Sequence, residues 1–173
     1  MARSGCMLAS PADRLVHQLK YNGWSALAEP MAAFMPVIAR RDDGRAEVVV
    51  PVPTTASRFR ERGYNQAELL ARAYARRIGQ PCRPLLGRTG EQVTQTALQA
   101  AARGANVAGA FAVVADGSTV LRNACVTLVD DVLTTGATAV ECTRVLTAAG
   151  AAGVRVVTFA RALDARRLSG IDN

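Results

Sequence analysis

The sequence has few of the residue types on which metal and covalent chemistry usually depend. Its 173 residues include a single histidine, His17, and four cysteines, no two of which form a CxxC pair. Because a structural zinc site needs several such ligands at short spacings, we expect no zinc in this chain. Cys125 and Cys142 lie in apolar patterns and are expected to be reduced core residues, and no residue stands out as a covalent nucleophile.

Long apolar runs are also absent. No stretch can span a bilayer, and residues 1–10 lack the apolar centre of a signal peptide, so we expect no membrane span and a cytoplasmic protein. Half of the residues are nevertheless hydrophobic and 20% are charged, which is enough apolar material for a real core. The length, and the lack of repeats or linkers, predict a single domain.

Lysine is nearly missing, since Lys20 is the only one among 21 lysine and arginine residues. The net charge of +7 and the pI near 10.0 favour an anionic partner, which could be a nucleotide, nucleic acid or an acidic protein. A sequence this rich in arginine and alanine can also reflect the coding genome. A generally basic protein therefore explains the charge equally well.

Apolar periodicity predicts strands that alternate with helices. Helices are expected over 12–21, 64–78 and 137–149, and strands over 48–50, 84–86, 111–114, 125–129 and 154–159. Ser10 is the expected cap of the first helix, and prolines at 30 and 36 break the helical pattern of 24–39. The β-branched run at 48–50 is typical of a central strand, and a loop is expected over 51–63. This order favours an α/β fold, a mostly parallel sheet flanked by helices.

The strongest functional signal is the segment Val126–Thr138, VTLVDDVLTTGAT. Asp130 and Asp131 would emerge at the carboxyl end of a parallel strand, where α/β sheets bind ligands, and carboxylates accept hydrogen bonds from ribose hydroxyls. Gly136 allows a tight turn, and threonine hydroxyls and helix N–H groups suit one phosphate. The lysine of a P-loop and a GxGxxG pattern are both absent. The segment predicts a ribose 5-phosphate site; the alternative is a buried strand that ends in a solvated turn.

This segment resembles the diphosphate-sugar signature of type I phosphoribosyltransferases. Four more segments are similar to the ComF family, which is linked with natural competence and DNA uptake. They are LKYNGW at 19–24, VVPVPTTASRFRERGYNQAELLA at 49–71, the segment 88–107 and VTFAR at 157–161. The resemblance implies a type I phosphoribosyltransferase fold in a single domain, with a small N-terminal helical hood over 1–45, a core over 46–161 and a tail over 162–173.

The resemblance also implies a ligand, phosphoribosyl diphosphate, with Mg²⁺ held mainly by substrate oxygens rather than directly by protein residues. Asp130, Asp131 and Arg88 would be catalytic. The residues implied to bind the ribose and its 5′-phosphate are Val129, Asp130, Asp131, Val132, Leu133, Thr134, Thr135, Gly136, Ala137 and Thr138. Those implied to bind the diphosphate are Pro53, Thr54, Thr55, Arg58, Arg60, Arg62 and Arg103.

Several of these assignments have plain structural alternatives. Arg58, Arg60 and Arg62 alternate along a predicted loop, and a solvated loop end explains them as well. The segment 88–106, which holds Arg88 and Arg103, corresponds to the hood loop that closes over the substrate in these enzymes, and an ordinary surface excursion is its alternative.

The N-terminal motif residues are harder to assign. Tyr21 and Trp24 lie where relatives bind the acceptor, but both could be core residues, and we expect this for Trp24. The motif GYNQ at 63–66 has no predicted role beyond Asn65 as a helix cap. Many ComF relatives carry an N-terminal zinc-binding cysteine cluster, of which only Cys6 would be present here.

Two functions of different classes follow. An enzyme would transfer phosphoribose to a nitrogen acceptor with release of diphosphate, mainly by positioning and shielding the reactants. The alternative is a non-catalytic competence or DNA-uptake factor, or a sensor of the phosphoribosyl ligand, that associates with nucleic acid. The acceptor is not specified by the sequence, and the apolar N-terminal helices could form a homodimer interface.

Overall fold

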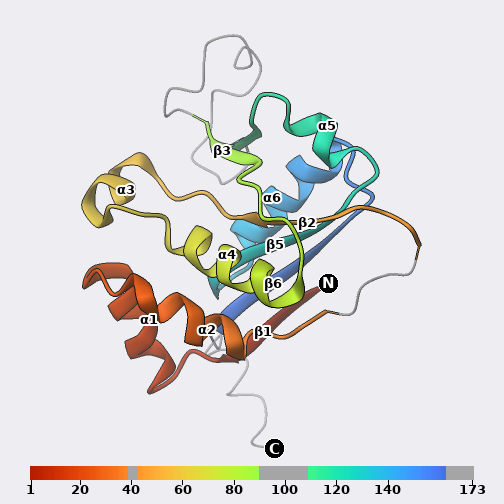
Figure 1. The fold of residues 1–173 in the computed structure, drawn as a ribbon. Coiled ribbons are helices and arrows are strands. Elements are labelled where there is room, and N and C mark those ends of the chain that lie inside the picture. The colour runs from red at the N-terminus through yellow and green to blue at the C-terminus, as the bar shows by residue number, and fades with distance from the viewer. Residues whose placement is uncertain (39–42, 90–108, 163–173) are drawn as a thin grey trace, which may run out of the picture.

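A central sheet of four parallel strands organises the protein (Figure 1). The computed structural model describes residues 1–38, 43–89 and 109–162. The strand order is β1-β6-β5-β2, and the bounds are β1 (Ala2–Met7), β2 (Glu47–Pro51), β5 (Cys125–Leu133) and β6 (Gly153–Arg161). The predicted fold class, a mostly parallel sheet flanked by helices, is confirmed.

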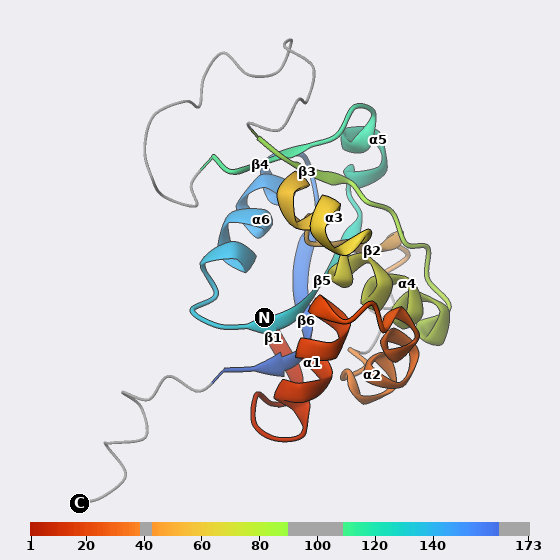
Figure 2. The same ribbon diagram turned by 90° about the vertical axis from the view of Figure 1, so that its left-hand side faces the viewer.

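Helices cover both faces of this sheet (Figure 2). One face packs against α1 (Ala12–Tyr21), the 3₁₀ helix η1 (Ser25–Leu27), α2 (Ala28–Phe34) and α4 (Gln66–Ile78). The other face packs against α6 (Ala137–Ala148), α5 (Gly117–Leu121) and the antiparallel pair β3 (Leu86–Arg88) and β4 (Phe111–Val113). The two inner strands, β5 and β6, are therefore apolar on both faces along most of their length.

Local signals place most of these elements correctly. Helix α4 begins after Asn65, whose side-chain Oδ1 accepts a hydrogen bond from the N–H of Ala67 at 3.1 Å, and it ends at Gly79 with φ +67°. Residues 25–34 form two short helices; Pro30 lies in the first turn of α2, and Pro36 follows the end of that helix. Helix α1 has the predicted bounds, but Pro11 occupies the cap position with no side-chain cap bond, so Ser10 is not the cap.

Three elements were missed: β1, α5 and α3 (Ala56–Arg62). The segment 51–63 was predicted to be a loop, and α3 occupies half of it. This helix buries none of its residues, so it has no apolar stripe that a periodicity search could find. Its ends nevertheless carry clear signals, because Thr55 accepts a hydrogen bond from the N–H of Arg58 and Gly63 has φ +78°.

Strand β2 is an edge strand of the four-stranded sheet, not a central one. Its β-branched run is still buried, because the chain from Pro81 to Arg83 lies along its outer edge. The N–H of Val49 donates to the carbonyl of Pro81, and the N–H of Arg83 donates to the carbonyl of Val49, each at 2.9 Å. Within the described ranges, no helix is long and apolar enough to cross a membrane.

Candidate functional site

The predicted ribose-phosphate segment forms the end of β5, a short turn and the start of α6. Strand β5 continues through Asp130 and Asp131 to Leu133, four residues beyond its predicted end at 129. Gly136 precedes α6 with φ +84°, a conformation that other residues rarely adopt. Gly136 brings no side chain that could cap α6, and the positive N-terminal end of this helix faces the turn that precedes it.

A small hollow of about 30 Å³ lies at this helix start. It is lined by six of the predicted residues, which are Asp130, Val132, Leu133, Thr134, Gly136 and Thr138. The carboxylate, the threonine side chains and the helix N-terminus thus meet in one place. Of the other predicted residues in this segment, Val129 is buried within the sheet and Thr135 accepts a hydrogen bond from the N–H of Ala137 at 3.4 Å.

Thr158 in β6 also lines the hollow and was not among the predicted site residues. It lies opposite Asp130 in the register of β5 and β6. Its buried hydroxyl is 2.7 Å from the Ser4 hydroxyl and donates to the carbonyl of Ala160. The motif VTFAR at 157–161 contains this threonine, so its position in the adjacent parallel strand was the available signal.

The two carboxylates interact with each other and with one lysine. The N–H of Asp131 donates to Oδ1 of Asp130 at 2.9 Å, and the Nζ of Lys20 in α1 lies 2.6 Å from Oδ2 of Asp131. Desolvation, followed by the charge of Asp131, raises the pKa of Asp130 well above its usual value, while Lys20 lowers it. Asp130 therefore tends to keep its proton, and a nearby positive charge favours its ionised form.

The predicted diphosphate segment adjoins this site. The N–H of Val52 donates to the carbonyl of Val129 at 2.9 Å, so the loop after β2 is bonded to β5 just before the acidic pair. Arg88 in β3 lies against the same loop: its Nε donates to the carbonyl of Pro53 at 3.3 Å, and its guanidinium lies 4.8 Å from the ring centroid of Phe111. The structure thus brings Arg88 to the predicted loop.

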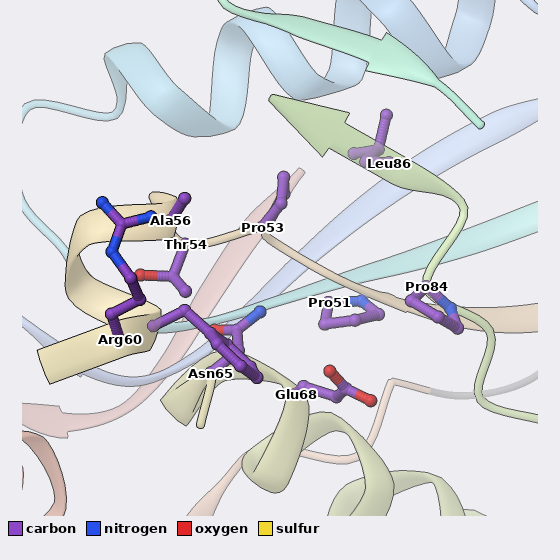
Figure 3. Close-up of a pocket in the computed structure, with 10 residues that line it drawn as sticks. Pro51, Pro53, Thr54, Ala56, Arg60, Asn65, Glu68, Pro84 and Leu86 are labelled. Carbon is purple, nitrogen blue, oxygen red and sulfur yellow. The ribbon is translucent and has the colours of Figure 1, made fainter. Parts of the chain in front are cut away.

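Thr54 in this loop has a buried hydroxyl oxygen with no hydrogen-bond partner among the described residues. A buried polar atom of this kind is costly unless a partner is supplied. Beside it opens a cleft of about 450 Å³ between α3, the start of α4 and β3 (Figure 3). The predicted residues Pro53, Thr54 and Arg60 line the cleft, together with Pro51, Ala56, Phe59, Asn65, Glu68, Pro84 and Leu86, which were not predicted.

The three arginines of this segment do not form one cluster. They lie on helix α3 rather than on an extended loop, so Arg58 and Arg62 share a side of the helix and Arg60 faces away from them. Arg62 is engaged locally, with its guanidinium 4.8 Å from the ring centroid of Tyr21 and a hydrogen bond of 2.9 Å to Oε1 of Gln66. Their binding of diphosphate stays a prediction.

The motif at 63–66 fastens the N-terminal helix to the site. The hydroxyl of Tyr64 donates to the carbonyl of Leu19 at 2.6 Å, and Nδ2 of Asn65 donates to the carbonyl of Val52 at 3.0 Å. Trp24, which was expected in the core, is 57% exposed, and Tyr21 is exposed as well, so the expectation for Trp24 was wrong. The segment is held by its backbone and by Leu19 instead of by its largest side chain.

Other predictions concern metals, thiols and the hood loop. The described part of the chain contains no group of three or more His, Cys, Asp and Glu residues that could hold a metal ion, and magnesium stays an expectation. Cys125 and Cys142 are buried as predicted, and burial, with a smaller effect of Asp130, raises the pKa of Cys142 to about 12. Arg103 lies outside the described residues.

Solved structures that are similar to this chain include the allosteric regulatory enzyme of purine biosynthesis, with a TM-score of 0.48, 24% identity, and coverage of 83% of this chain and 26% of that one. Glutamine phosphoribosylpyrophosphate (PRPP) amidotransferase from B. subtilis, complexed with ADP and GMP, has a TM-score of 0.45, 21% identity, and coverage of 82% and 26%. This chain therefore spans about a quarter of either.

No family model matches the sequence. Curated relatives are similar over most of it. DNA utilization protein YhgH is 33% identical over 161 residues in Salmonella typhi (88% of this chain, 68% of the relative) and 32% identical over 161 residues in Escherichia coli K12 (90% and 69%). Competence protein F of Haemophilus influenzae is 32% identical over 160 residues (88% and 69%). The chain therefore belongs to the family of YhgH and Competence protein F, the ComF family that its motifs resemble.

Proposed function

We propose that this protein binds phosphoribosyl diphosphate at the carboxyl ends of β5 and β2. The observation that carries the proposal is the hollow at the start of α6, where Asp130, Thr134, Gly136 and Thr138 converge. The helix N-terminus and the threonine hydroxyls suit the 5′-phosphate, and the carboxylates suit the ribose hydroxyls. The unpartnered hydroxyl of Thr54 supports the diphosphate half of the assignment.

The same arrangement suits transfer chemistry. The C1–O bond would break with its electron pair leaving on diphosphate, and a nitrogen nucleophile would form the new bond at C1 and then lose a proton. Asp130 and Asp131 would orient the ribose, and Arg88, held at the loop after β2, would stabilise charge on the departing group. Magnesium, bound with the substrate, would supply further positive charge to the diphosphate oxygens.

Titration calorimetry with phosphoribosyl diphosphate and magnesium tests the ligand. Asp130→Asn combined with Asp131→Asn should weaken binding by well over tenfold, because charge-assisted hydrogen bonds contribute about 1.5–3 kcal/mol each and tenfold corresponds to about 1.4 kcal/mol. Asp116→Asn is a matched control, since Asp116 is exposed and its left-handed backbone also suits asparagine. No heat from the wild type, or equal affinity in the double variant, would remove the assignment.

A second candidate is a competence or DNA-utilization role without turnover, which the names of the relatives and the net charge of +7 favour. Incubation with the ligand and a panel of bases or ammonia separates the two candidates through release of diphosphate. Silence across the panel would favour a binding protein. A salt-dependent shift of single-stranded DNA that disappears in an Arg58→Gln and Arg60→Gln variant would favour nucleic-acid association.

A further inference from the structure

Lys20 has an unusual position for the one lysine of an arginine-rich chain. It lies in the last turn of α1, far from β5 in the sequence, yet its Nζ lies 2.6 Å from Oδ2 of Asp131. The Asp131 side chain is 6% exposed and that of Lys20 is 23% exposed, so this is a largely buried ion pair. Such a pair is more than a surface contact, because an isolated buried charge would be strongly unfavourable.

The helix turn that carries Lys20 is fixed from both sides. The buried Leu19 accepts the hydrogen bond from Tyr64 at 2.6 Å, and the ring of Tyr21 packs under the guanidinium of Arg62. The next residue after Tyr64, Asn65, donates to the carbonyl of Val52 in the loop after β2. One connected set of contacts thus joins the acidic pair, the end of α1 and the predicted diphosphate loop.

The charged groups around Asp130 determine how readily it gives up its proton. Among the described residues, the groups that act on Asp130 are Asp131 on the same strand, which raises its pKa, and Lys20 from α1, which lowers it. Cys142 of α6 also feels the charge of Asp130, but its own raised pKa keeps its thiol neutral. Two adjacent carboxylates without a cation tend to share a proton, and a protonated carboxyl accepts hydrogen bonds less well.

We propose that Lys20 is a positioning residue of this site, whose ammonium group fixes the Asp131 carboxylate and supplies the positive charge that lets the acidic pair accept ribose hydroxyls. The inference rests on the proposed function and deepens it. Lysine suits this role because its ammonium group is a compact point charge on a flexible stem. The guanidinium of arginine is instead a planar fork.

Two substitutions and one matched control test this role by calorimetry. Lys20→Met removes the charge at similar length, Lys20→Arg keeps it, and Arg14→Met removes a charge from an exposed position on the same helix. At each pH between about 6 and about 9, Arg14→Met should bind phosphoribosyl diphosphate with magnesium with the same affinity as the wild type. Lys20→Met should bind at least about tenfold more weakly near neutral pH and recover as the pH rises, and Lys20→Arg should restore most of the affinity.

The sign follows from the charge that is removed. Without Lys20 the pKa of Asp130 rises further, so its proton is lost only at higher pH, and affinity should increase with pH more steeply in Lys20→Met than in the wild type. A purely structural role would weaken binding by the same factor at every pH. That result, or an affinity for Lys20→Met within about twofold of the wild type throughout, would overturn the proposal.

A measurement without ligand keeps this inference separate from the proposed function. Carbon-13 NMR titration of the aspartate carboxyls should place the Asp130 midpoint higher in Lys20→Met than in the wild type, and the same spectra show that both are folded. Equal midpoints would overturn the role of Lys20 even if the ligand binds. Failure of the wild type to bind would overturn the proposed function, and the carboxyl titration would still decide the effect of Lys20.

Discussion

The buried carboxylate of Glu141 makes stability depend on pH in a defined way. Its Oε1 accepts a hydrogen bond of 2.6 Å from the N–H of Gly109, two residues before β4, and both its oxygens accept hydrogen bonds from Arg144, each at 2.8 Å. The hydrogen bonds from Arg144, followed by that from Gly109, lower the pKa of Glu141 from 4.5 to about 2. The contact ties α6, whose first turn borders the candidate site, to the chain that leads into β4.

The size of the effect follows from the pKa shift and from solvent screening. A shift of this size corresponds to an upper limit of about 3 kcal/mol, at about 1.4 kcal/mol per unit. The Glu141 side chain is 8% exposed but that of Arg144 is 61% exposed, so water screens the ion pair and we expect about 1–2 kcal/mol. A lowered folded-state pKa stabilises above the unfolded value, so this contribution is complete above about pH 5 and is lost as the pH falls toward about 2.

Urea unfolding of Glu141→Gln against the wild type measures this contribution. Glutamine keeps the shape and an acceptor for Gly109, so the free energy of unfolding should fall by about 1–2 kcal/mol at neutral pH and by close to nothing near pH 2. Glu61→Gln is the control, since Glu61 is exposed and makes no ion pair within the described residues. A difference that stays constant from about pH 7 to about pH 2 would refute the reasoning.

Two further predictions concern the backbone around the site. Tyr64→Phe removes the hydrogen bond to the carbonyl of Leu19 and should lower the free energy of unfolding by about 0.5–1.5 kcal/mol in urea titrations; no change would mean that the bond does not hold α1 in place. Gly136→Ala should lower the free energy of unfolding by about 1–2 kcal/mol because φ is +84°; space is not the cause, since an added Cβ would meet only Leu133 at an ordinary 3.9 Å. If the variant unfolds at the same temperature as the wild type, the turn is not strained.

The sequence predicted an element well where the residues at its ends, or a continuous apolar run, mark its bounds. Helix α4 has its asparagine cap and its glycine end, and β5 has a continuous apolar run, so both were found. Helix α3 was missed because it buries no residue, and β1 because it is an exposed edge strand whose only inward-facing side chains are partly buried. The end of β5 was predicted too early because charged residues are mostly exposed and usually follow a buried strand. Asp131 instead lies within β5 as a buried, ion-paired carboxylate.

The candidate site divides in the same way between local and distant information. The segment 126–138 was recognisable as a candidate ribose-phosphate site because strand, acidic pair, glycine turn and helix start follow each other directly in the chain. The sequence did not reveal Thr158, the residues that line the cleft or the role of the 63–66 motif, because each depends on which distant segment packs beside it.

The sequence by itself determined the α/β class, the order of most strands and helices, and the glycine turn before α6, since backbone preferences and apolar periodicity act over a few neighbouring residues. Only the tertiary structure decided that Lys20 pairs with Asp131, that Arg88 reaches the loop at Pro53, and that the three arginines at 58–62 separate on a helix. The physical reason is that packing of α1 and β3 against the sheet creates these contacts, and no local pattern encodes which charged side chains the folded chain brings together.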